Sequence, residues 1–144
     1  MAHRKLYLSA EVTSGDVKLS LNAESQDNTW ELTQNVDVTA NGLIICQTGM
    51  YYVYNSVQFR TKEYVKKQTV YFYMRQTNKQ HTSHVLLRNL HTVAENLSVD
   101  RETGFSGGVF HLDEGDVIEV FVSGQGLVET GRNTTYIGLV RLVH

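Results

Sequence analysis

Cysteine is nearly absent from this chain, because Cys46 is the only one among 144 residues. A single thiol cannot close an internal disulfide, so folds stapled by several disulfides are excluded. Long apolar runs are also missing, since stretches such as residues 43–46 fall far short of the roughly 20 residues that cross a bilayer. The first five residues lead into patterned sequence without the apolar core of a secretory signal. If the protein is extracellular, we expect this chain to be a mature or excised part of a longer one.

An excess of positive charge is lacking as well. The 13 Lys and Arg residues stand against 15 Asp and Glu residues, which gives a formal net charge of −2 and a pI near 6.3. This balance gives no electrostatic reason to bind a phosphate backbone, so we expect no nucleic-acid partner.

Alanine is scarce, and β-branched and aromatic residues take its place. The chain has five Ala against 36 Val, Ile and Thr residues together, with eight Tyr and five Phe. Residues of these types favour pleated strands, whereas alanine favours helices. Together with the length, the composition predicts a single all-β domain over residues 1–144.

Apolar and polar residues alternate with a period of two along much of the chain, which is typical of strands. In residues 49–59 this places Tyr51 and Val53 on one face and Tyr52 and Tyr54 on the other. Because the second face is apolar too, we expect a loop or another subunit to cover it. Further strands are predicted at residues 5–10, 29–32, 36–39, 43–46, 69–75, 84–90, 105–112, 117–123 and 134–143. About ten short strands without a helical pattern indicate a two-sheet antiparallel sandwich or jelly roll.

The turn Asp113-Glu-Gly-Asp116 separates two of these predicted strands. Its glycine can supply a positive φ, so residues 105–112 and 117–123 are predicted to form a hairpin. The three carboxylates could bind calcium, although a solvated turn explains them equally well.

Residues suited to catalysis are few. Cys46 ends an apolar strand, where a small buried side chain is a more usual role than a nucleophile. His81 and His84 have no third metal ligand nearby in the sequence. The glycine-rich stretch 104–108 is not followed by the Lys-Ser or Lys-Thr of a phosphate-binding loop. We therefore expect no catalytic residue, no metal site and no cofactor.

Two glycosylation sequons occur, beginning at Asn96 and Asn133. Both lie beside predicted loops, and they favour an extracellular location.

Three blocks of the chain, in this order, carry a recognisable pattern: Gly49-Met-Tyr-Tyr-Val-Tyr-Asn-Ser-Val-Gln-Phe59, Gly107-Gly-Val-Phe-His-Leu112 and Tyr136-Ile-Gly-Leu-Val-Arg-Leu142. They resemble the Gly-x-Tyr-x-x-Tyr-x-x-Val-x-Phe, Gly-Gly-Val-Phe-x-Leu and closing Tyr/Phe-Phe-Gly-x-x-x-Leu strands of tumour necrosis factor superfamily ligands. Ala2-His3 and Trp30-Glu31 also fall where many members carry these pairs. The chain is identified as a member of that family.

The resemblance implies a two-sheet jelly roll that forms a homotrimer and binds cysteine-rich receptors in the grooves between subunits. By motif it places Tyr54, Phe105 and Tyr136 near the trimer axis, with Tyr52 and Phe110 close by. Such a trimer would cover the second aromatic face. It also implies a type II membrane protein, displayed on the cell surface or secreted after shedding, whose anchor precedes this chain.

Receptor contacts in this family lie in loops. The candidates implied here are Tyr64, Lys66, Lys67, Lys79, Gln80, His81, Glu129, Arg132 and Asn133. Members that engage death receptors often carry a tyrosine in the loop that corresponds to residues 76–81, and this chain has none there. That departure puts the usual death-receptor contact in doubt.

Other features of the family are matched unevenly. Many members carry a cysteine pair that bridges two loops, and one binds zinc through an axial cysteine; Cys46 fits neither arrangement. The spacing from residue 122 to residue 136 is most like that of Fas ligand or its lymphotoxin-related relatives.

Two alternatives stay open: a complement-type globular head, which shares the jelly roll and the trimer, and a jelly-roll lectin or enzyme with a sugar or metal site.

Overall fold

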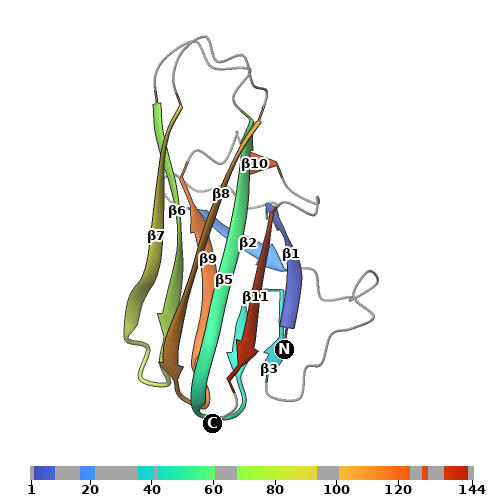
Figure 1. The fold of residues 1–144 in the computed structure, drawn as a ribbon. Coiled ribbons are helices and arrows are strands. Elements are labelled where there is room, and N and C mark those ends of the chain that lie inside the picture. The colour runs from blue at the N-terminus through green and yellow to red at the C-terminus, as the bar shows by residue number, and fades with distance from the viewer. Residues whose placement is uncertain are drawn as a thin grey trace.

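The computed structural model describes residues 2–8, 17–21, 36–40, 42–60, 68–93, 101–123, 128–129 and 135–142. Every regular element within these ranges is a strand, and the strands form two antiparallel sheets packed face to face (Figure 1). The predicted all-β sandwich is confirmed.

The front sheet contains the longest ladder of the molecule. Its order is β8 (Arg101–Leu112), β5 (Gly49–Arg60), β11 (Tyr136–Arg141) and β1 (Ala2–Leu8). The pairing of β5 with β8 runs unbroken from Gly49 opposite Leu112 to Arg60 opposite Arg101. The short strand β10 (Val128–Glu129) continues the other edge of β5 beyond the end of β11.

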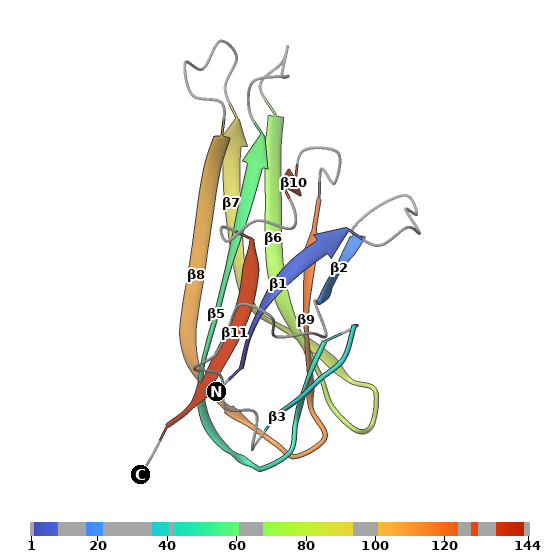
Figure 2. The same ribbon diagram turned by 90° about the vertical axis from the view of Figure 1, so that its right-hand side faces the viewer.

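The back sheet is built around β9. Its strands are β7 (Ser83–Val93), β6 (Gln68–Thr77), β9 (Val117–Val122), β2 (Val17–Leu21), β4 (Leu43–Ile45) and β3 (Val36–Val38). One edge of β9 pairs with β6, and the other edge pairs with β2 at one end and β4 at the other. Because β1 pairs with β11 and then with β2, it joins the two sheets along one side (Figure 2).

The period of two in the sequence decides which side chains enter the core. On β5, Tyr51, Val53, Val57 and Phe59 are fully buried between the sheets, as predicted. Val70, Phe72 and Met74 enter from β6, and the rings of Phe59 and Phe72 meet with centroids 6.2 Å apart across the sandwich.

The predicted hairpin at residues 105–123 is wrong. β8 pairs with β5 in the front sheet, whereas β9 pairs with β6, β2 and β4 in the back sheet. The turn therefore carries the chain from one sheet to the other. Gly115 does adopt a positive φ of 90°, but this local signal does not specify whether the flanking strands pair with each other.

The predicted burial of Cys46 is also wrong, because its side chain is exposed. Leu43 and Ile45 point into the core, so alternation turns Ile44 and then Cys46 outward.

Several predicted strands differ in extent from those observed. The strand expected at residues 5–10 is β1, which begins at Ala2, while β2 and β10 had not been predicted at all. The strand expected at residues 29–32 lies outside the described residues.

Candidate functional site

The outer face of the front sheet carries a cluster of large side chains that do not enter the core. We call it the front platform, and it consists of Tyr52 and Tyr54 on β5, Phe105 and Val109 on β8, and Tyr136 on β11. The register brings them together, since Tyr52 lies opposite Val109, while Ser56 lies opposite both Phe105 and Tyr136. The platform thus spans three neighbouring strands.

Tyr54 is the centre of the front platform. Its ring stacks on Tyr52 with centroids 5.7 Å apart and on Phe105 with centroids 6.4 Å apart. Tyr136 approaches it edge-on at 6.1 Å. These three contacts bring Tyr52, Phe105 and Tyr136 around Tyr54 within the single chain.

The front platform is open to solvent in the single chain. Phe105 and Val109 are each 52% exposed, and Tyr52, Tyr54 and Tyr136 are half-buried. An apolar surface of this kind in the middle of a sheet face is typical of an interaction site.

One residue that the resemblance implies near the trimer axis lies on the other face of its strand in the single chain. Phe110 lies opposite Tyr51 in the register, on the inward side of β8, and packs against the core. Val109, which was not among the predicted residues, lies on the outer face of β8 instead. Counting in steps of two from Phe105 would have found it, because successive side chains of a strand point to opposite faces.

The outer face of the back sheet is aromatic too, but its rings are largely covered by cations. Tyr73 stacks on Tyr71 and on Phe121. Arg75 lies 4.3 Å above the Phe121 ring, and Arg88 lies above both tyrosines. Cation–π contacts of this kind cover a ring and leave the charge in water.

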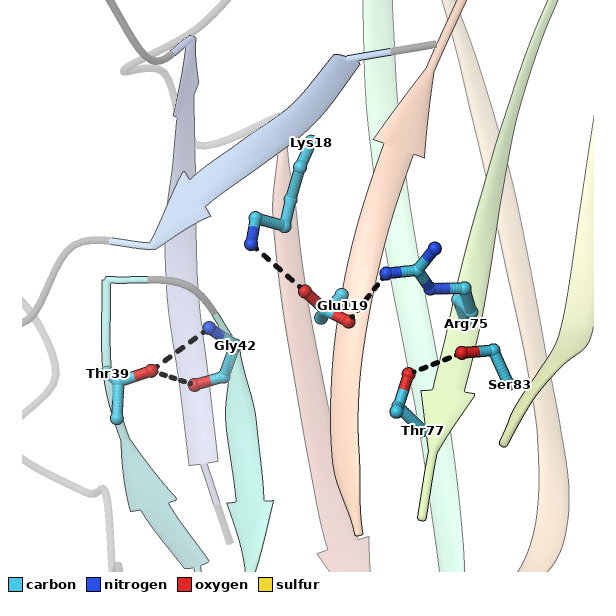
Figure 3. A network of polar contacts seen from close by, with 7 residues as sticks. All are labelled: Lys18, Thr39, Gly42, Arg75, Thr77, Ser83 and Glu119. Carbon is cyan, nitrogen blue, oxygen red and sulfur yellow. Dashed lines mark hydrogen bonds and ion pairs between the residues drawn. The ribbon is translucent and has the colours of Figure 1, made fainter. Parts of the chain in front are cut away.

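A buried carboxylate anchors this cover (Figure 3). Glu119 on β9 pairs with Arg75 on β6 and with Lys18 on β2, each at 3.1 Å. The aromatic rings of the back face are therefore covered by side chains of the same chain. Leu90 and Val85 on the edge strand β7 remain exposed.

The turn between β6 and β7 holds three of the predicted receptor-contact residues. Lys79, Gln80 and His81 are all exposed. The turn is fixed by Asn78, whose Oδ1 accepts hydrogen bonds from the backbone N–H groups of Gln80 and Thr82 at 3.0 and 2.9 Å. His81 closes it with a φ of 64°, a left-handed conformation that is uncommon outside glycine.

This turn packs beside the turn between β8 and β9. The aliphatic stem of Lys79 lies over Gly115, so close that a Cβ built on Gly115 would lie 2.8 Å from Cγ of the lysine. The two turns border an open cavity of about 360 Å³, lined by Thr48, Asn78, Lys79, Gln80, Asp113, Glu114 and Asp116.

Asp116 has a structural role in this region. It is 2% exposed and accepts hydrogen bonds from the backbone N–H of Asp113 and from Nε2 of Gln76. Within the described ranges, no group of three or more His, Cys, Asp and Glu residues could hold a metal ion. The hydrogen bonds of Asp116 give it a structural role that does not require a metal ion.

Cys46, the two histidines and the glycine-rich stretch were the other candidates for a catalytic or ligand-binding role, and their surroundings do not favour one. Desolvation raises the pKa of the Cys46 thiol, and the neighbouring Asp37 adds to the rise, which disfavours the nucleophilic thiolate. His81 and His84 are both exposed. The stretch 104–108 lies inside β8, so it is strand and not a phosphate-binding loop.

No helix among the described residues is long and apolar enough to cross a membrane.

Several predicted site residues lie outside the described part of the chain. These are Tyr64, Lys66, Lys67, Arg132 and the sequon residues Asn96 and Asn133. Glu129 lies on β10, where its backbone pairs with Gln58.

Tyr54 makes the stability of the fold sensitive to alkaline pH. Burial raises the pKa of its phenol to about 12, and Tyr136 and Tyr52 add to the rise. A group whose pKa is higher in the folded chain stabilises the fold below its unfolded pKa, and this contribution disappears as the pH rises through the folded value. We expect the free energy of unfolding to fall between about pH 10 and pH 12.

Urea denaturation at about pH 8 and about pH 11 measures this fall. Tyr54→Phe should reduce it, because the variant cannot ionise at this position. An equal fall in both proteins would show that Tyr54 does not contribute.

Comparison with known proteins gives matches over most of the chain. The TNF (Tumour Necrosis Factor) family matches residues 21–142. Tumor necrosis factor ligand superfamily member 11 from Rattus norvegicus is 29% identical over 143 residues, and the Homo sapiens protein is 28% identical over 144 residues. Each alignment covers 92% of this chain and 44% of the relative, so the chain spans less than half the length of these relatives.

Solved structures of murine APRIL share the fold. Crystal structures at pH 5.0 and pH 8.0 both superpose with a TM-score of 0.73, at 20% and 18% sequence identity. The superpositions cover 98% of this chain and 100% of the APRIL chain. At this level of identity the likeness shows the fold alone.

Proposed function

Because this chain belongs to the tumour necrosis factor family, we propose that it is a cytokine ligand that forms a homotrimer and clusters cysteine-rich receptors of the TNF-receptor family. TNF-family ligands are cytokines and not enzymes. The receptors would bind in the three grooves between subunits. Three equivalent sites convert a modest affinity at each groove into avidity and hold the receptor chains close together.

The observation that supports this proposal most is the contrast between the two sheet faces. Arg75 and Arg88 cover the aromatic rings of the back face, whereas Phe105 and Val109 of the front platform are left half-exposed. Covering the exposed parts of these aromatic and aliphatic side chains would favour assembly, because obligate interfaces bury apolar surface of this kind. The front platform is therefore the face that we assign to the trimer.

The receptor-binding residues are proposed by family likeness and by exposure. Lys79, Gln80 and His81 form a rigid, polar turn at one end of the sandwich. Tyr64, Lys66, Lys67, Glu129 and Arg132 complete the proposed set. We further propose an extracellular location, with a membrane anchor outside this chain and glycans on Asn96 and Asn133.

Solution mass tests the assembly. One chain has a mass of 16.3 kDa, so a homotrimer should give about 49 kDa by light scattering, and this value should persist on dilution. A receptor panel of cysteine-rich ectodomains then tests binding. A monomer near 16.3 kDa would remove the grooves and with them the proposed mechanism.

Single side chains of the β6–β7 turn should matter little for receptor affinity. We expect Lys79→Ala to lower it by less than about 1 kcal/mol, because exposed polar residues at the rim of an interface rarely dominate binding. His81→Gly, which accommodates the positive φ of 64°, should behave alike. Surface plasmon resonance against the receptor found in the panel measures both, and a loss of about 2 kcal/mol or more would place a binding hot spot here.

A further inference from the structure

Two tyrosines of the front platform lean onto glycines of the neighbouring strands. Gly138 on β11 lies directly opposite Tyr54, and a Cβ built on Gly138 would overlap Cζ and Oη of the Tyr54 ring. A Cβ on Gly107 of β8 would lie 2.5 Å from Oη and 3.0 Å from Cζ of Tyr52. Any other residue at either position would therefore push the ring away from the sheet.

The adjacent glycine, Gly108, serves the opposite side of β8. A Cβ there would lie 3.0 Å from Cε2 of Phe110 and 3.6 Å from Leu87, which are packed against the core. The Gly107-Gly108 pair thus splits between the two faces, and only Gly107 lies under the front platform.

The rings that rest on these glycines determine the shape of the whole platform. Tyr54 contacts Tyr52, Phe105 and Tyr136, so raising its ring from Gly138 would disturb all three contacts. Interface cores are packed as densely as protein interiors, and a displaced ring costs shape complementarity as well as contact area.

We propose that Gly107 and Gly138 are positioning residues for self-assembly, which hold the Tyr52 and Tyr54 rings low against the front sheet so that a second copy of this chain can pack on them. The inference rests on the proposed homotrimer. It assigns to the two glycines a role in the assembly interface in addition to any role in the fold.

A pair of double-mutant cycles on the trimer dissociation constant tests this role. Fluorescence-detected sedimentation of the 144-residue chain supplies the constant. We expect Gly107→Ala in the wild-type chain to raise the dissociation constant about tenfold or more. In a Tyr52→Phe chain the same substitution should raise the constant less than about threefold, because Oη of Tyr52, the atom nearest the new methyl group, is absent. Gly138→Ala should likewise weaken assembly strongly in the wild-type chain, which has Tyr54, and only slightly in a Tyr54→Leu chain.

The outcomes separate this inference from the proposed function. A wild-type chain that is monomeric overturns the homotrimer itself. A trimeric wild type in which the glycine substitutions cost the same with and without the tyrosine ring overturns the positioning role. Gly108→Ala is the matched control, since it adds a methyl group to the same strand on the inward face and should leave the dissociation constant within about threefold of wild type. If Gly138→Ala does not fold, the Gly107 cycle decides alone.

Discussion

Tyr54→Asp is expected to convert the proposed homotrimer into a folded monomer. The substitution puts a carboxylate at the centre of the front platform, in place of a ring that contacts Tyr52, Phe105 and Tyr136. In the assembly this charge would be buried without a cation, which costs several kcal/mol per subunit. In the separated chain this position lies on the outer face of the sheet and is only partly buried, so the carboxylate costs less there than in the assembly and the core is untouched.

Light scattering and circular dichroism measure the two parts of this result. The mass should fall from about 49 kDa to the 16.3 kDa of one chain, while the strand signal is retained. Gln58→Glu is the matched control, because Gln58 lies on the same face of β5 but outside the platform, beside Thr103. A Tyr54→Asp protein that stays fully trimeric would show that the front platform is not the contact surface.

The alternation along β5 could be predicted from sequence because it depends on local geometry alone. Successive side chains point to opposite faces, so the separation of Tyr51 from Tyr52 and Tyr54 follows once the strand is recognised. The same rule, applied to β8, would have excluded Phe110 from the platform and included Val109. The family motif covers residues 107–112 as a block but does not carry the direction of each side chain.

Pairing between distant segments could not be predicted in this way. The hairpin at residues 105–123 was expected because a turn residue joins two strands, but β8 and β9 find their partners elsewhere in the chain. β10 is two residues long and is defined by its pairing with Phe59 and Gln58, so no local sequence pattern predicts it. The burial of Glu119 between Lys18 and Arg75 likewise joins three strands that are far apart in sequence.

Most of the proposed receptor residues lie in loops, which vary in sequence among relatives more than the strands they connect. The likeness to Fas ligand rests on the spacing between residues 122 and 136, and most of that loop lies outside the described residues. It stays a prediction. The turn from Lys79 to His81 is described, and its three side chains are polar and exposed.

Tyr51→Ala should lower the free energy of unfolding, in contrast to Tyr54→Asp on the same strand, which should affect assembly. Tyr51 is fully buried, and its hydroxyl donates a hydrogen bond of 2.6 Å to the backbone carbonyl of Gln47. Truncating a buried aromatic side chain leaves a cavity and typically costs about 3–5 kcal/mol. That is a large part of the roughly 5–15 kcal/mol that stabilises an ordinary domain.

The measurement is urea denaturation in a Tyr54→Asp background, because coupling to assembly would otherwise add to the apparent stability. Tyr52→Ala, one residue along, is the matched control and should cost less than about 1.5 kcal/mol, since its half-buried ring lies outside the core. Tyr51→Phe, which keeps the ring and loses only the hydrogen bond, should cost about 1 kcal/mol. If Tyr51→Ala and Tyr52→Ala cost the same, the two faces of β5 would not differ in burial, and the front platform would lose its status as a surface separate from the core.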